Sequence, residues 1–316
     1  QNNHDKKIYK KSVYPLTQEN IDYAIKLHLK GNISEAIKYY KYFIDNGNKD
    51  SRVFCNYGLI LQNLGDLEKA QQMMENAIHV NPNDILAHNN LAGILQELGK
   101  YDSAEEILNK CLELDPNNSI TYSNLGAVLI HQGKLDRSEL ILKKGIEVNP
   151  NEVNSYLSLG VLMRLSDKIN RAIEYTNKAL EIQPNNEAGY CNLGDFFRIS
   201  KEYKKAIINF EKVLKLNNNN ESAKFGLIIC KGLICDWSDY DVSNNWMNNL
   251  GIIGKTLDPY PFLLYDDSPI KNLKRSKKYA KKGVYVKEIV NFPKNKEGKI
   301  KIGYFSEDFR DHPVTH

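Results

Sequence analysis

Two histidines near the end of the sequence, His312 and His316, are the residues best suited in type and spacing to chemistry. They lie close together in the polar stretch "SEDFRDHPVTH", directly after the apolar run "KIKIGYF". A histidine changes its charge near neutral pH, so a pair in a loop is a candidate for proton transfer. The other five histidines fall at unrelated positions, and we expect them to be solvated or packed.

A second set of chemically useful residues is a row of asparagines at a fixed spacing. The members of the row are Asn56, Asn90, Asn124 and Asn192. Ser158 interrupts the row, and Asp22 occupies the equivalent position in the first repeat. An Asn amide donates and accepts hydrogen bonds, so such a row can hold the backbone of an extended peptide without reading its sequence. The alternative is that these amides bond only to one another or to neighbouring helices.

The cysteines do not form a metal site in the sequence. Five are scattered along the chain, and Cys230 and Cys235 lack the spacing of metal ligands. No His or Cys pair completes a zinc site, so we expect no metal and no bound cofactor. An odd number of scattered cysteines predicts free thiols in a reducing compartment, which we take to be the cytoplasm.

The overall composition is that of a soluble protein. Of 316 residues, 41% are hydrophobic and 26% charged; no window is apolar enough to span a bilayer, and the polar, basic start is not a secretory signal.

Residues 271–301 hold eleven lysines and Arg275 against Glu288 and Glu297. Such a block is usually a solvated helix face or linker; the alternative is a surface for an anionic partner, such as a nucleotide sugar or nucleic acid. Neither zinc-finger spacing nor interleaved aromatic residues support nucleic acid specifically.

Prolines and glycines recur along the chain with one constant period. Each set has four members in one register: Pro82, Pro116, Pro150 and Pro184, and Gly31, Gly65, Gly99 and Gly133. Their spacing is that of the tetratricopeptide repeat, a unit of about 34 residues that forms two antiparallel helices. The Gly ends the first helix because it adopts the left-handed conformation easily, and the "NPN" and "DPN" stretches break the second helix.

The fold class that follows is all-α, a right-handed superhelix of stacked helical pairs whose concave surface suits extended partners. Residues 1–16 are expected to be flexible, and six repeats cover 17–220. Residues 221–298 indicate a partial repeat, short helices and a basic linker. Residues 299–316 have the composition of a first buried strand and a loop entering a helix, the opening of a parallel α/β sheet that binds ligands beyond its strand ends.

The order of these parts resembles the protein O-GlcNAc transferase family, in particular its bacterial and SPINDLY-like branch. The stretches that carry the resemblance follow the repeats in this order: "CDWSDYD", "DPYPFLLYDDSP" with "KYA", and "KIKIGYFSEDFRDHPVTH". The resemblance covers the chain from about Thr17. It implies a tetratricopeptide array followed by two Rossmann-like lobes that transfer a sugar from a nucleotide diphosphate to Ser or Thr of proteins.

The same resemblance assigns roles to the candidate residues. The Asn row corresponds to residues that contact the polypeptide acceptor. His312 corresponds to the active-site histidine, either as general base for the acceptor hydroxyl or as a positioning group. His316 opens the following helix, where backbone N–H groups can face an anionic ligand.

The implied donor is UDP-GlcNAc, with GDP-fucose and a hexose donor as the variants of other branches. Most of both lobes lies beyond His316, so we expect the chain to be incomplete at its C-terminus and inactive alone.

Three functions follow from these features. The first is the acceptor-recruiting part of a protein O-glycosyltransferase, and its alternative is a non-catalytic scaffold that binds extended peptides. The third is a structural adaptor that forms a homodimer through a face of the array. The Asn row fits the first two equally, and only the terminal strand and loop distinguish them.

Overall fold

The computed structural model describes residues 17–47, 49–236, 249–259, 261–262 and 268–280. The chain divides into two compact units, residues 1–244 and 245–316. The described residues form 14 helices and no strand, so the prediction of an all-α helical repeat array is confirmed for them. The strand and loop predicted for 299–316, with His312 and His316, lie outside the described residues.

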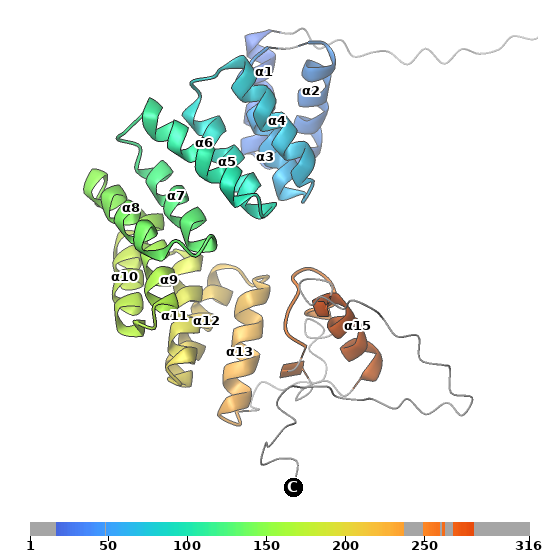
Figure 1. The fold of residues 1–316 in the computed structure, drawn as a ribbon. Helices are drawn as coiled ribbons and strands as arrows, with labels where there is room; N and C mark the ends of the chain where they lie inside the picture. The colour runs from blue at the N-terminus through green and yellow to red at the C-terminus, as the bar shows by residue number, and fades with distance from the viewer. Residues whose placement is uncertain (1–16, 48, 237–248, 260, 263–267, 281–316) are drawn as a thin grey trace, which may run out of the picture. The chain divides into compact units, whose positions relative to one another are not determined.

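The first unit is a series of paired helices, in which successive helices lie side by side along the chain (Figure 1). Its helices are α1 (Gln18–Leu29), α2 (Ile33–Asp45), α3 (Ser51–Asn63), α4 (Leu67–Val80), α5 (Ile85–Glu97), α6 (Tyr101–Leu114), α7 (Ser119–His131), α8 (Leu135–Val148), α9 (Val153–Leu165), α10 (Ile169–Ile182), α11 (Glu187–Ile199), α12 (Tyr203–Leu216) and α13 (Glu221–Leu233). Odd-numbered helices are the first helix of each repeat, and even-numbered helices are the second.

A polar side chain caps the first helix of every repeat. Each of these side chains accepts a hydrogen bond from a backbone N–H in the first turn: Thr17, Asp50, Asp84, Asn118, Glu152, Asn186 and Asn220. Such a cap stabilises a helix by about 1 kcal/mol because it pairs a donor that has no partner within the helix. The local sequence therefore fixes where each repeat begins.

The turn between the two helices of a repeat places one residue in the left-handed conformation. Four glycines predicted to end their helices have φ between 73° and 80°: Gly31, Gly65, Gly99 and Gly133. The fifth and sixth repeats have no glycine at this position. Asp167 and Lys201 adopt the same conformation there, with φ of 58° and 62°. The turn geometry is thus imposed by the packing of the two helices as well as by the residue.

The core lies between the two helices of each repeat and continues from one repeat to the next. Within a repeat, small residues of the first helix face larger residues of the second. A Cβ added to Gly58 would lie 2.9 Å from Met74 Cε, and one added to Gly194 would lie 2.5 Å from Phe210 Cε1. Met74 is fully buried, and Phe210 is 2% exposed. The Phe210 ring therefore requires a glycine at position 194, whereas the flexible end of the Met74 side chain can move away from a Cβ at position 58.

Polar side chains link consecutive repeats. The Ser51 hydroxyl donates to the capping carboxylate Asp84 of the next repeat at 3.5 Å. The Ser119 hydroxyl does the same with Glu152 at 3.2 Å. In these two cases one carboxylate both caps its own helix and receives a bond from the preceding repeat, which fixes the register of neighbouring repeats.

The second unit contains α15 (Pro269–Ala280), which packs against the loop around Leu250. Arg275 is fully buried: its Nε donates to the Leu250 carbonyl at 3.0 Å, and its guanidinium carbon lies 4.2 Å from the centre of the Phe262 ring. Lys278 donates to the Ile252 carbonyl at 3.3 Å. These two members of the basic segment thus fix the loop to the helix.

None of the five cysteines, all of which lie in the described ranges, forms a disulfide. Cys55, Cys111 and Cys230 are buried, whereas Cys235 is exposed. Burial raises the pKa of the Cys55 thiol to about 12 and the pKa of Cys111 and of Cys230 to about 11. In the part of the chain that the structure describes, no helix has the length and apolar character required to span a membrane.

Candidate functional site

The predicted Asn row lies on the first helices of the repeats, which contact one another in order along the array. α5 contacts α7, α7 contacts α9, and α9 contacts α11. We call the surface formed by these first helices the inner face. The four asparagines are all partly exposed on it, each from a different helix.

A groove opens on the inner face between α7, α9 and α11. It has a cavity volume of about 180 Å³ and is lined by Ala127, Ile130, His131, Leu157, Ser158, Val161, Ala188 and Asn192. Most of this lining is aliphatic. The polar side chains that reach it are one imidazole, one hydroxyl and one amide.

Two polar side chains of the groove have no hydrogen-bond partner within the described part of the chain. Among the described residues, neither the Ser158 hydroxyl nor the Asn192 amide forms a hydrogen bond. Both are partly exposed. A hydroxyl and an amide can each donate and accept, so together they can pair with the N–H and C=O groups of another backbone. This groove therefore combines an apolar surface with unpaired backbone-binding groups.

The middle of the Asn row is more constrained than the sequence suggested. Asn124 Nδ2 donates to Asn89 Oδ1 at 2.9 Å, and Asn89 Nδ2 donates to Thr121 Oγ1 at 2.9 Å. Asn90 Nδ2 is buried and has no hydrogen-bond partner among the described residues. An unpaired buried amide costs about 1–3 kcal/mol, so Asn90 carries a donor that the described part of the protein leaves unsatisfied. The row is therefore a set of inequivalent amides.

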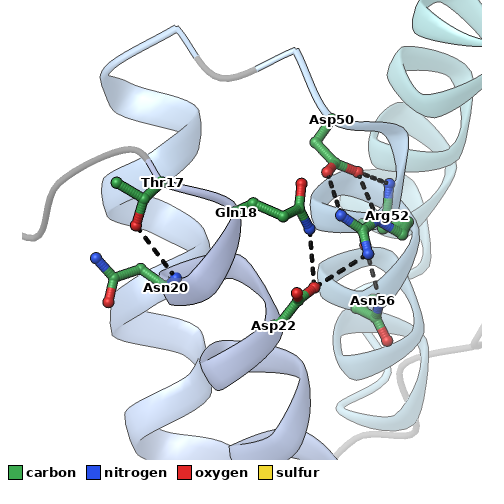
Figure 2. Close-up of polar contacts among 7 residues, drawn as sticks. All are labelled: Thr17, Gln18, Asn20, Asp22, Asp50, Arg52 and Asn56. Atoms are coloured by element: carbon green, nitrogen blue, oxygen red, sulfur yellow. Dashed lines mark hydrogen bonds and ion pairs between the residues drawn. The ribbon is translucent and has the colours of Figure 1, made fainter.

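The first two repeats carry a charged cluster (Figure 2). Arg52 Nη2 lies 2.6 Å from Asp50 Oδ2, and its Nη1 lies 3.1 Å from Asp22 Oδ1. Gln18 Nε2 donates to Asp22 Oδ1 at 2.8 Å, and Asn56 Nδ2 donates to the Arg52 carbonyl at 2.8 Å.

The hydrogen bond from Arg52 holds the pKa of Asp50 below its ordinary value. Two carboxylates already occupy this guanidinium, so its bonds are used within the protein. The cluster therefore ties the first two repeats together.

Two histidines of the array, His88 and His131, have structural contacts. His88 is buried, with Nδ1 2.8 Å from the Asp84 carbonyl oxygen. The His131 ring stacks on Tyr101, with centroids 5.2 Å apart and planes at 3°. Within the described ranges, no three His, Cys, Asp or Glu side chains lie where they can hold a metal ion. What these residues can do chemically is to hydrogen-bond and to bury apolar surface.

The sequence interpretation found Asn192 and Ser158 but did not identify the aliphatic lining around them. Leu157 and Val161 occupy positions that are apolar or small in most repeats, so their types alone do not mark a site. One available signal is the composition of α7, which contains no Asp, Glu, Lys or Arg. A surface helix normally has a charged side, and α7 has none.

Sequence models described as the tetratricopeptide repeat match the chain. One matches residues 50–117 and 83–151, and another matches 153–186 and 188–220, which together is more than half of the chain. No curated protein is similar enough to the sequence to count as a match.

Solved structures show the same fold at low sequence identity. TTC0263, a thermophilic TPR protein of Thermus thermophilus, has a TM-score of 0.54 at 19% identity, covering 57% of this chain and 98% of that one. PilF of Pseudomonas aeruginosa has a TM-score of 0.50 at 20% identity, covering 73% and 97%. PilW, a type IV pilus biogenesis factor, has a TM-score of 0.57 at 16% identity, covering 68% and 100%.

Proposed function

The chain is a tetratricopeptide repeat protein, and from this premise we propose that its inner face binds an extended segment of a partner polypeptide. The observation that carries the proposal is the groove between α7, α9 and α11, whose Ser158 and Asn192 side chains are unpaired among the described residues. An extended segment exposes the N–H and C=O groups that such side chains pair with.

The Asn row extends this surface toward the N-terminal repeats. Asn90 has an amide nitrogen without a partner among the described residues, and Asn192 has a partly exposed amide. Asn124 and Asn56 each use Nδ2 within the protein, which leaves their carbonyl oxygens to accept from a bound backbone. We therefore expect Asn90 and Asn192 to contribute most to binding.

Selection of random peptides displayed on phage against the immobilised protein tests this function. Enriched peptides are then synthesised with a fluorophore, and their dissociation constants are measured by fluorescence anisotropy. We expect Asn90→Ala with Asn124→Ala, and Asn192→Ala separately, to weaken binding about tenfold while the helical circular dichroism stays unchanged.

The matched control is Asn177→Ala, an exposed position on the second helix α10, which is expected to bind as the unaltered protein does. If no peptide is enriched, or if the inner-face variants bind as tightly as Asn177→Ala, the inner face is not a peptide-binding surface.

A second candidate function is transfer of a sugar to the bound polypeptide. It is favoured by the order of the stretches "CDWSDYD" and "KIKIGYFSEDFRDHPVTH" after the repeats, which resembles the protein O-GlcNAc transferases. In this function the first strand of a Rossmann-like catalytic region begins at Lys299. The inner face recruits the acceptor. The oxygen of a Ser or Thr hydroxyl then bonds to the anomeric carbon of GlcNAc, the bond to the UDP oxygen breaks, and UDP departs. His312 accepts the hydroxyl proton or positions the acceptor.

The test is transfer of radiolabelled GlcNAc from UDP-GlcNAc by the longest natural form of the protein to a peptide selected as above. His312→Ala is expected to reduce turnover at least about a hundredfold, which is typical of loss of a general base. Near-normal turnover of His312→Ala removes this residue from the mechanism. Absence of transfer with nucleotide-activated GlcNAc, fucose and hexose donors leaves the scaffold function alone.

A further inference from the structure

The middle of the inner face is nearly without charge. α7 contains no Asp, Glu, Lys or Arg, and Arg164 is the only charged residue of α9. On α11, Arg198 is paired with Asp195 at 3.1 Å. None of the groove-lining side chains is a carboxylate, an ammonium or a guanidinium. A charged side chain entering this groove would therefore lose water without gaining a counter-ion.

Gly93 is a second unusual feature of the same surface. It lies in the interior of α5, three residues after Asn90 and therefore on the same side of the helix. It stands one full repeat before Ala127, which in turn stands one full repeat before Val161, and both of these line the groove. The three residues thus occupy one equivalent position on three neighbouring first helices.

No internal contact requires a glycine at position 93. A Cβ added there would meet no atom within 4 Å, whereas one added to Gly126 would collide with Leu142. A glycine in a helix interior costs about 1 kcal/mol relative to alanine. The residue therefore lowers helix stability and leaves the backbone of α5 open on the inner face, which allows another backbone to approach closely.

From these features we infer that the occupant of the inner face is an uncharged, extended polypeptide segment whose backbone passes over Gly93 and whose aliphatic side chain fills the groove between α7, α9 and α11. The inference rests on the proposed peptide-binding function and names the chemistry of the partner. The absence of lining charge selects against acidic and basic segments, because each would bury an unpaired charge. The groove volume of about 180 Å³ is below the range of small-molecule pockets, so a single side chain is the better fit.

The first test uses the peptides selected by display. We expect them to share an aliphatic residue flanked by uncharged residues. Replacing that aliphatic residue by Asp or by Lys is expected to weaken binding at least about tenfold. Val161→Asp in the protein is expected to produce a similar loss, with its fold checked by circular dichroism.

The outcomes separate the two proposals. Enrichment of peptides rich in charged residues, or equal binding of the Asp-bearing and aliphatic peptides, overturns this inference and leaves the proposed function intact. Failure to enrich any peptide overturns both.

The second test uses Gly93. Gly93→Ala is expected to raise the urea concentration at the unfolding midpoint and to weaken peptide binding, and Gly93→Leu is expected to weaken binding about tenfold or more. The matched control is Ser103→Leu at an exposed position of α6, which is expected to leave binding unchanged. If Gly93→Leu binds peptide like Ser103→Leu, the partner does not pass over α5 at this position.

Discussion

The second repeat (α3 and α4) and the sixth repeat (α11 and α12) form the same pair of helices but differ in the side chains that lie on the inner face. Asn56 and Asn192 are equivalent, but the residue four positions earlier is Arg52 in the second repeat and Ala188 in the sixth. Arg52 is held by Asp22 and Asp50, whereas Ala188 lines an uncharged groove. The helical pair and the proposed binding surface are therefore set by separate positions of the repeat.

The same two repeats also differ in the packing between their two helices. Where the two helices cross, Gly58 faces the flexible side chain of Met74 in the second repeat, and Gly194 faces the ring of Phe210 in the sixth. The turn residue is Gly65 in the second repeat and Lys201 in the sixth, and both have positive φ. The sixth repeat thus holds a more rigid crossing and a more strained turn.

The largest expected difference in stability between the two repeats arises from substitutions at the helix crossing. Gly194→Ala is expected to lower the free energy of unfolding by about 2 kcal/mol, because the added Cβ would lie 2.5 Å from a Phe210 ring that also packs against Gly226. Gly58→Ala is expected to be nearly neutral, since the end of Met74 can move and alanine favours the helix. Urea unfolding followed by circular dichroism measures both, and equal losses would show that the two crossings are equally rigid.

A smaller change in stability, of opposite sign, is expected from a substitution in the turn between the two helices of the sixth repeat. Lys201→Gly is expected to stabilise the protein by about 0.5–1 kcal/mol, because glycine removes the strain of φ 62° and only part of this gain is offset by the freer unfolded chain. Gly65→Lys in the second repeat is expected to lose a similar amount. Thermal unfolding of both variants tests the pair, and a loss of stability in Lys201→Gly would contradict the assignment of strain.

The smallest expected difference concerns pH and the helix caps. Asp50 caps α3, and Asn186 is the equivalent cap of α11, so replacing either by Ala should cost about 1 kcal/mol at neutral pH. The hydrogen bond from Arg52 lowers the pKa of Asp50 in the folded state. Its contribution is therefore complete above the ordinary Asp pKa and is lost as pH falls through the lowered value.

Urea unfolding of the two variants over an acidic pH series checks this expectation. The loss caused by Asp50→Ala should shrink by a few tenths of a kcal/mol on acidification, because the pair is partly exposed and screened. The loss caused by Asn186→Ala should stay constant. A constant loss in both variants would mean that the Arg52 pair adds no stability.

The helical array was predictable because its signals are local. Gly65 at the turn and Pro82 after the second helix each act through their own backbone, so their constant period was enough to identify the helical pairs. The exceptions are Asp167 and Lys201, where contacts between the two helices overrode the preference for glycine.

The candidate site was predictable only in part, because it depends on how separate repeats stack. The positions of Asn90 and Asn192 followed from the period, but the bond from Asn124 to Asn89 joins two repeats and has no local signal. Leu157 looks like an ordinary core residue in the sequence. Only the stacking of α7, α9 and α11 places it in a groove.

The buried thiols of the array make its internal motions measurable by chemistry. Cys55 lies in α3, Cys111 in α6 and Cys230 in α13, and burial raises the pKa of each. Because the thiolate is the reactive form, a thiol reagent can modify each residue only when its own repeat opens. The modification rate of each cysteine, resolved by mass spectrometry, therefore gives the opening frequency of three separate stretches in an unlabelled, unaltered protein.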